Sequence, residues 1–211
     1  MIVVDIETSG SDRVKCGIWQ IGAINLNNPK DYFLQEARID ERDIIEDRIL
    51  EKSGKTKKEL MDKKKQSEKQ LLINFFEWIE EKPMKNFLCQ NPAFDFVFLN
   101  IKSKKYDLIM PVHYRNFDLH SIAQTKYYEL NKKFLVNDDT LENKGEFLVK
   151  GIHSEMGLSN ILKLCGMRDN RKEHNALEDA KLTGECFFRL MYGQNLFPEY
   201  AKFKIPRELT K

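Results

Sequence analysis

Two carboxylates that lie two residues apart, Asp5 and Glu7, follow a short apolar and β-branched run at the start of the chain. In a β-strand, side chains two residues apart point to the same face, so both carboxylates would point together. A buried strand tolerates such like charges poorly unless cations neutralise them. The pair could therefore bind a metal ion. A strand end at which both charges reach water is the alternative for so common a tripeptide.

His174 and Asp179 form a second candidate pair, at the start of a segment with helical periodicity. On one helix, five residues would turn the two side chains apart by roughly 140°, so they converge only if His174 precedes the helix. Ala176, Ala180 and Thr183 form the apolar stripe of this helix, which places Asp179 close to its buried face. A buried carboxylate needs a partner, either a cation site or a lone salt bridge.

Asp95 is a third candidate acid. Asn91 followed by Pro92 predicts a helix N-cap and a proline in the first turn, which places Asp95 in that same turn. The positive end of the helix dipole favours an anion there. Because acids are common in first turns, this position alone does not indicate a function.

The elements that must position these residues begin with a predicted hairpin and continue with alternating strands and helices. Strand patterns cover residues 1–6, 17–26 and 31–38, and Asn27-Asn28-Pro29-Lys30 is the expected turn between the last two. Further strands are expected at 87–89 and 112–117, and helices at 71–79, from 91 to 101, from 118 to 130, at 158–165 and at 176–191. This order predicts an α/β fold, with a mixed sheet covered by helices.

Length and composition predict one compact domain in 211 residues, 41% of them hydrophobic and 32% charged. We expect the domain at residues 1–193, with an inserted hairpin or long loop at 131–153, followed by a tail at 194–211. No run approaches the roughly 20 apolar residues of a membrane span, and the N-terminus lacks the pattern of a secretory leader, which predicts a cytoplasmic protein without membrane contact. The four cysteines form no close pair, so reduced thiols are expected rather than a zinc knuckle.

Three segments, taken in chain order, resemble the motifs of the DEDDh 3′→5′ exonucleases of the ribonuclease H-like fold. This family contains bacterial proofreading subunits, ribonuclease T and oligoribonuclease. The segments are residues 3–10, 90–95 and 174–180. The resemblance also covers residues 18–23, and weaker similarity runs through residues 50–60 and 153–166. Two departures are that Gln90 stands where the family usually has histidine, and that the insertion at 131–153 has no fixed counterpart.

The resemblance implies a mixed five-stranded ribonuclease H-like sheet flanked by helices, and it implies roles for the candidate residues. Asp5, Glu7, Asp95 and Asp179 would hold two Mg²⁺ or Mn²⁺ ions, and His174 would be the general base. Trp19 could stack on a base or belong to the core. The residues with an implied contact to the substrate are Thr8, Ser9, Gly10, Trp19, Gln90, Asn91 and Phe94.

The function predicted in this way is that of a metal-dependent 3′→5′ exonuclease. It would release 5′-mononucleotides from the 3′ end of single-stranded DNA, as in proofreading or DNA repair. The implied partner is nucleic acid with a free 3′ end, and a DNA polymerase subunit is a further candidate. A 3′→5′ exoribonuclease of the oligoribonuclease or ribonuclease T type is the first alternative, because the motifs do not separate the two substrates. A catalytically inactive nucleic-acid-binding module is the second, although every expected ligand is present.

Overall fold

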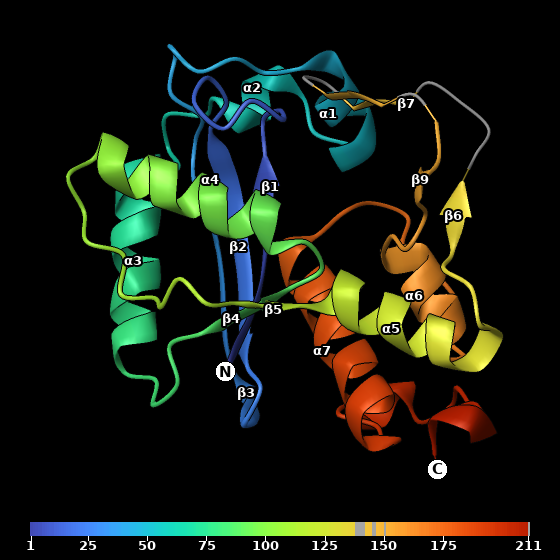
Figure 1. Ribbon diagram of the computed structural model, residues 1–211. Helices are drawn as coiled ribbons and strands as arrows, with labels where there is room; N and C mark the ends of the chain where they lie inside the picture. Colours follow the sequence, from blue (N-terminus) through green and yellow to red (C-terminus); the bar gives the residue numbers. More distant parts are fainter. Residues whose placement is uncertain (138–141, 145–146, 150, 211) are drawn as a thin grey trace.

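The computed structural model describes residues 1–137, 142–144, 147–149 and 151–210. A central five-stranded sheet has the strand order β3-β2-β1-β4-β5 (Figure 1). Its strands are β1 (Ile2–Thr8), β2 (Ile18–Asn25), β3 (Asn28–Glu36), β4 (Phe87–Cys89) and β5 (Phe117–Asp118). The β1-β2 and β2-β3 pairs are antiparallel, whereas β4 pairs in parallel with β1 and β5. The predicted α/β fold with a mixed five-stranded sheet is confirmed.

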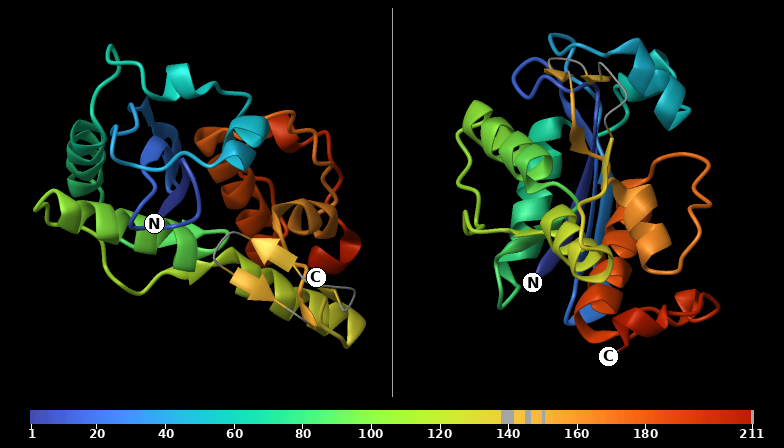
Figure 2. Two further views of the ribbon diagram at one scale, coloured as in Figure 1. Left: turned by 90° about the horizontal axis from the view of Figure 1, so that it is seen from above. Right: turned by 45° about the vertical axis from the view of Figure 1, so that its right-hand side comes forward.

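Helices cover both faces of this sheet (Figures 1 and 2). They are α1 (Asp47–Ser53), α2 (Lys57–Leu60), α3 (Glu68–Glu80), α4 (Pro92–Lys105), α5 (Leu119–Asn131), α6 (Leu158–Leu164) and α7 (Ala176–Tyr192). Helices α3 and α4 lie on one face and α7, with α5 and α6 beside it, on the other, while α1 and α2 lie over one end of the strands. Within the described residues, no helix is both long and apolar enough to cross a membrane.

Alternation along β1 assigns its two sets of side chains to different cores. Ile2 and Val4 pack in the cluster under α3 and α4, whereas Val3 packs in the cluster that contains the buried side chains of α7. Asp5 and Glu7 continue the Val3 set at the two-residue period of a strand. Both carboxylates therefore lie on the sheet face that α7 covers.

Two predicted boundaries were wrong. The hairpin turn is Leu26-Asn27 rather than residues 27–30, because Asn25 pairs with Asn28. Pro29 lies within β3, an edge strand, where the missing N–H of proline is tolerated. The strand expected at 112–117 is reduced to the two residues of β5, since the preceding segment forms other contacts, such as the hydrogen bond from His113 N–H to the Lys85 carbonyl at 2.8 Å.

The predicted insertion contains short antiparallel pairs in its described part. Strand β6 (Val136–Asn137) pairs with β9 (His153–Ser154), and β7 (Glu142–Lys144) pairs with β8 (Phe147–Val149). Residues 138–141, 145–146 and 150 of the same insertion lie outside the described residues. Helix α5 runs to Asn131, so the predicted start of the insertion coincides with a helix end.

The C-terminal segment packs against α7. It forms two short 3₁₀ helices, η1 (Pro198–Tyr200) and η2 (Arg207–Leu209), and Phe197 and Leu209 are buried in the same cluster as α7. Glu185 in α7 is completely buried and accepts the Phe197 N–H at 2.9 Å. The predicted tail is thus continuous with the core.

Candidate active site

The N-terminus of α7 is held against the sheet by β2. The Ala176 N–H donates to Gln20 Oε1 at 2.8 Å, and Asn175 caps the helix by accepting the Leu177 and Glu178 N–H groups. Gly22 allows this close approach, because a Cβ atom there would lie 2.1 Å from the Leu177 nitrogen. The first turn of α7 therefore faces the acids of β1.

His174 and Asp179 meet as their spacing predicted. His174 precedes the cap residue of α7, and its Nδ1 lies 3.1 Å from Asp179 Oδ2. Asp179 is buried, with 3% of its surface exposed, whereas the His174 side chain is half exposed. The hydrogen bond to Asp179 raises the pKa of His174 above its usual value, with burial acting in the opposite direction.

Asp95 reaches β1 from the opposite helix layer. It lies in the first turn of α4, after the predicted proline, and its Oδ1 accepts the Ile6 N–H at 3.2 Å. Ile6 stands between Asp5 and Glu7, so this hydrogen bond places Asp95 beside both of them. Burial raises the pKa of Asp95 to about 7, partly offset by its hydrogen bond from Ile6.

The four carboxylates form one cluster at this end of β1. Burial raises the pKa of Asp5 well above its usual value, and the charges of Asp95 and Asp179 raise it further. Burial also raises the pKa of Glu7 to about 7, although His174 opposes the shift. Ligand atoms of Glu7, His174 and Asp179 all lie within 4.8 Å of one another.

This donor set fits a divalent cation. Carboxylate oxygens are the hard ligands that Mg²⁺ and Mn²⁺ prefer. Four neighbouring carboxylates are costly to bury without positive charge. Among the described residues, Arg171 is the one arginine or lysine in an ion pair with any of the four, at 3.0 Å from Asp179. A bound cation would supply the positive charge that the cluster lacks.

Four of the predicted substrate residues line one cavity of about 320 Å³ next to the carboxylates. They are Thr8, Gly10, Asn91 and Phe94. Its wall also contains residues that the sequence analysis did not single out, namely Ser11, Arg13, Arg48, Ile49 and Lys52. The volume lies within the range of small-molecule sites, about 300–1,000 Å³.

Three other predicted substrate residues lie outside this cavity, and their side chains have structural contacts. Trp19 is 1% exposed and packs with Ile39 and Leu60, so it cannot stack on a base in this arrangement. Ser9 is fully buried, and its hydroxyl donates to the Ile44 carbonyl at 2.6 Å. Gln90 donates to the Met156 carbonyl at 3.4 Å. Trp19 and Ser9 are thus buried in this arrangement, whereas the substrate contact of the half-buried Gln90 stays a prediction.

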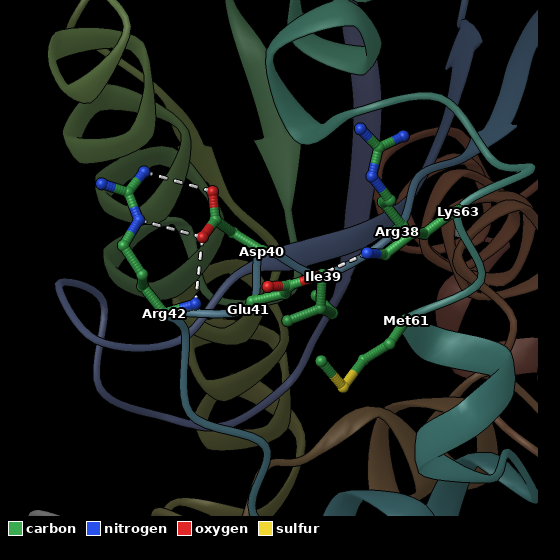
Figure 3. A pocket seen from close by; sticks show the side chains of 7 residues that line it. All are labelled: Arg38, Ile39, Asp40, Glu41, Arg42, Met61 and Lys63. Atoms are coloured by element: carbon green, nitrogen blue, oxygen red, sulfur yellow. Dashed lines mark hydrogen bonds and ion pairs between the residues drawn. The ribbon is translucent and has the colours of Figure 1, made fainter.

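A separate cavity of about 450 Å³ lies between the segment that follows β3 and the segment that follows α2 (Figure 3). Four of its charged side chains pair within the wall: Asp40 with Arg42 at 3.1 Å, and Glu41 with Lys63 at 3.0 Å. None of the predicted site residues lines it. We assign it no part in the chemistry.

The sheet has the fold of known nucleases, and the family comparison defines the chain as a hydrolytic nuclease. The model of the exonuclease family named for ribonuclease T matches residues 2–187. The chain belongs to this exonuclease family, and its activity is that of an exonuclease. No curated protein sequence matches the chain.

Solved structures of other nucleases share the fold. The nuclease domain of 3′hExo, a DEDDh family member bound to rAMP, is 17% identical; the match covers 98% of this chain and 95% of that domain, with a TM-score of 0.62. E. coli Exonuclease I in complex with a dT13 oligonucleotide is 16% identical over 89% of this chain, with a TM-score of 0.65. Cell-death related nuclease 4 is 13% identical over 90% of this chain, with a TM-score of 0.65. This chain spans 40% of the Exonuclease I chain and 62% of the cell-death related nuclease.

Proposed function

We propose that the cluster of Asp5, Glu7, Asp95 and Asp179 hydrolyses the last phosphodiester bond of a single-stranded nucleic acid and releases a 5′-mononucleotide. The observation that carries the proposal is the convergence of acids from β1, α4 and α7 beside a cavity of nucleotide size. Thr8, which directly follows Glu7, lines this cavity. The terminal nucleotide would therefore lie in the cavity with its phosphate at the carboxylates.

The four carboxylates are the proposed ligands of two divalent cations, Mg²⁺ or Mn²⁺. When bound, the cations neutralise charge around the phosphate and lower the pKa of the attacking water. The residues themselves fix the positions of the oxygen donors: Asp95 through the Ile6 N–H, and Asp179 through its contacts to His174 and Arg171.

His174 is the proposed general base. Its Nδ1 faces Asp179 at 3.1 Å, so a proton on Nδ1 is held by the carboxylate and Nε2 is left as the proton acceptor. The half-exposed ring can reach a water molecule at the phosphate. Asp179 thereby stabilises the imidazolium ion that forms when the water loses its proton.

DNA is the first proposed substrate, because the first and second motifs are most similar to those of the proofreading exonucleases. RNA is the second, since the 3′hExo nuclease domain was solved with rAMP, whereas Exonuclease I was solved with a DNA oligonucleotide. The proposed partner is nucleic acid with a free 3′ end. Association with a DNA polymerase subunit stays a prediction from the resemblance and is not part of this proposal.

The test is a digestion of 5′-labelled single-stranded DNA and RNA of the same sequence. We expect products shortened one nucleotide at a time in the presence of Mg²⁺ or Mn²⁺, no reaction in chelator, and 5′-mononucleotides as the released product. An Asp179→Asn variant serves as the inactive control. Internal fragments, or activity that survives the chelator, would contradict the proposal.

A further inference from the structure

Arg171 lies in the loop between α6 and α7 and contacts the carboxylate cluster. The sequence analysis did not predict it as a site residue. Its side chain is 11% exposed. Its Nη1 donates to Asp179 Oδ1 at 3.0 Å. Nothing in the sequence distinguishes it from its neighbours Arg168 and Lys172. The structure brings this guanidinium, and neither of the others, into contact with a proposed metal ligand.

Asp169 and Ser159 hold the other side of the Arg171 guanidinium by hydrogen bonds. Asp169 accepts hydrogen bonds from Arg171 Nε at 2.9 Å and from Nη2 at 2.6 Å. Ser159 in α6 donates to Asp169 Oδ2 at 2.5 Å and accepts from Arg171 Nη2 at 3.3 Å. Such a two-pronged arginine–carboxylate pair fixes both distance and orientation. Arg171 is therefore a rigid group at the site and not a mobile surface charge.

Asp179 is in turn held through both of its oxygens. Arg171 contacts Oδ1 at 3.0 Å and His174 contacts Oδ2 at 3.1 Å. The orientation of this carboxylate, and with it the position of the imidazole, depends on the clamped guanidinium. A misplaced ligand or base lowers turnover even where every reacting group is present.

The same guanidinium also affects the charge of the cluster. Arg171 acts on Asp5 and on Glu7 in the direction that favours their ionised forms, against the repulsion among the acids. Because arginine does not deprotonate in proteins, this positive charge stays at the site at any ordinary pH. It therefore offsets acid repulsion in the metal-free protein and opposes a divalent cation that enters.

We propose that Arg171 is a positioning residue with two separable effects: its geometry orients Asp179 and His174 for turnover, and its charge weakens the binding of metal ions to the free protein. The inference rests on the proposed function for its first effect only. The charge effect concerns metal binding by itself and is measured without a substrate.

The charge effect predicts the unusual combination of tighter metal binding and slower reaction in one variant. In Arg171→Ala and in Arg171→Gln, we expect Mn²⁺ to bind the metal-free protein roughly tenfold more tightly, because one nearby positive charge is gone. We expect the turnover of these variants to fall roughly 10- to 100-fold. In Arg171→Lys the positive charge remains, so Mn²⁺ affinity should equal that of the wild type. The two-pronged hydrogen bonding of the guanidinium is lost, so turnover should stay low.

The experiment is calorimetric titration of Mn²⁺ into each metal-free protein, together with kcat and KM on a single-stranded oligonucleotide. Arg168→Ala, an exposed arginine of the same loop, should leave both readings unchanged. Weaker or unchanged Mn²⁺ binding in the Ala and Gln variants would overturn the charge effect, and full turnover in Arg171→Lys would overturn the positioning effect. If the wild type itself shows no metal-dependent exonuclease activity, the proposed function fails, and the Mn²⁺ titrations still decide the charge effect.

Discussion

Asp179 connects the three kinds of chemistry that meet at this site. It is a proposed metal ligand, it holds the imidazole of His174, and it receives the guanidinium of Arg171. A single carboxylate in the first turn of α7 therefore couples the base to the cation site. Substitutions at its two partners separate these contributions, because each partner contacts a different oxygen.

Removal of the His174 imidazole is expected to affect the reaction more than metal binding. In His174→Ala, turnover should fall roughly 10²- to 10⁴-fold, because a general base is lost while all four carboxylates remain. Mn²⁺ affinity, measured by titration of the metal-free protein, should be nearly that of the wild type. His113→Ala, a change at an exposed loop histidine, is the control. A His174→Ala variant with full activity would exclude the assigned role.

From the raised pKa values of Glu7 and Asp95, we predict that metal ions stabilise the protein more at higher pH. Glu7 and Asp95 have pKa values of about 7 in the folded protein, raised from usual values of 4.5 and 3.8. The folded state then holds protons that the unfolded chain has lost, so the stability contributed by these protons is complete below about pH 4 and is lost as the pH rises through 7. Metal ions bind the deprotonated ligands, so their effect grows over the same interval.

The measurement is the Tm with and without Mg²⁺ at about pH 5.5 and about pH 8. We expect the contribution of Glu7 and Asp95 to make the metal-free protein less stable at the higher pH. We expect Mg²⁺ to increase the Tm more at the higher pH than at the lower pH. Equal increases at both pH values would show that protons do not compete with the cation at these carboxylates.

At the scale of elements, the contact between β2 and α7 decides whether the site forms. Gly22 lies against the backbone of Ala176 and Leu177, and Gln20 accepts the Ala176 N–H. Both contacts act on the same turn of α7 that carries Asp179. The position of this acid relative to β1 therefore depends on a glycine in the neighbouring strand.

A side chain at Gly22 should displace α7 and damage both stability and activity. In Gly22→Ala, the new Cβ would meet the Leu177 nitrogen at 2.1 Å, and backbone atoms cannot turn aside as a flexible side chain can. We expect a loss of about 3 kcal/mol in the free energy of unfolding and a large loss of turnover. Urea denaturation and the digestion assay measure the two effects. Gly157→Ala is the matched control, since nothing lies within 4 Å of its Cβ position.

At the scale of the whole molecule, the C-terminal segment completes the core beneath α7. Glu185 and Arg189 are both fully buried and pair at 2.7 Å. Glu185 also accepts the Leu196 and Phe197 N–H groups, while Arg189 donates to the Tyr200 carbonyl at 2.9 Å. A buried ion pair of α7 thus fixes a segment that follows it in the chain.

Removal of one partner of this pair should destabilise the entire fold. Glu185→Ala would leave the charge of Arg189 buried without its carboxylate and two N–H groups without an acceptor, at a cost of about 3–5 kcal/mol. The free energy of unfolding from urea denaturation measures this cost. Glu178→Ala changes an exposed glutamate of the same helix and should cost less than about 1 kcal/mol. A Glu185→Ala variant as stable as this control would mean that the buried pair contributes little to the stability of the fold.

Local patterns in the sequence predicted most strands and helices of the core and the placement of the five candidate residues, whereas the roles of these residues came from the resemblance to the exonuclease motifs. The two-residue spacing of Asp5 and Glu7, the first-turn position of Asp95, and the five-residue spacing of His174 and Asp179 each follow from the geometry of one element. Those patterns lie within a few residues of chain, where strand and helix periodicity determines direction.

Only the tertiary structure shows which predicted substrate residues line the same cavity. It also shows that Arg171 contacts Asp179 in the site. Trp19 and Ser9 carry side chains suited to a substrate, yet α2 and the loop before α1 cover them. Arg171 reaches Asp179 only because α6 supplies Ser159 beside Asp169. The hydrogen bond between Gln20 and Ala176 joins positions 156 residues apart. Such contacts depend on how whole elements dock, and no spacing within a short segment encodes that docking.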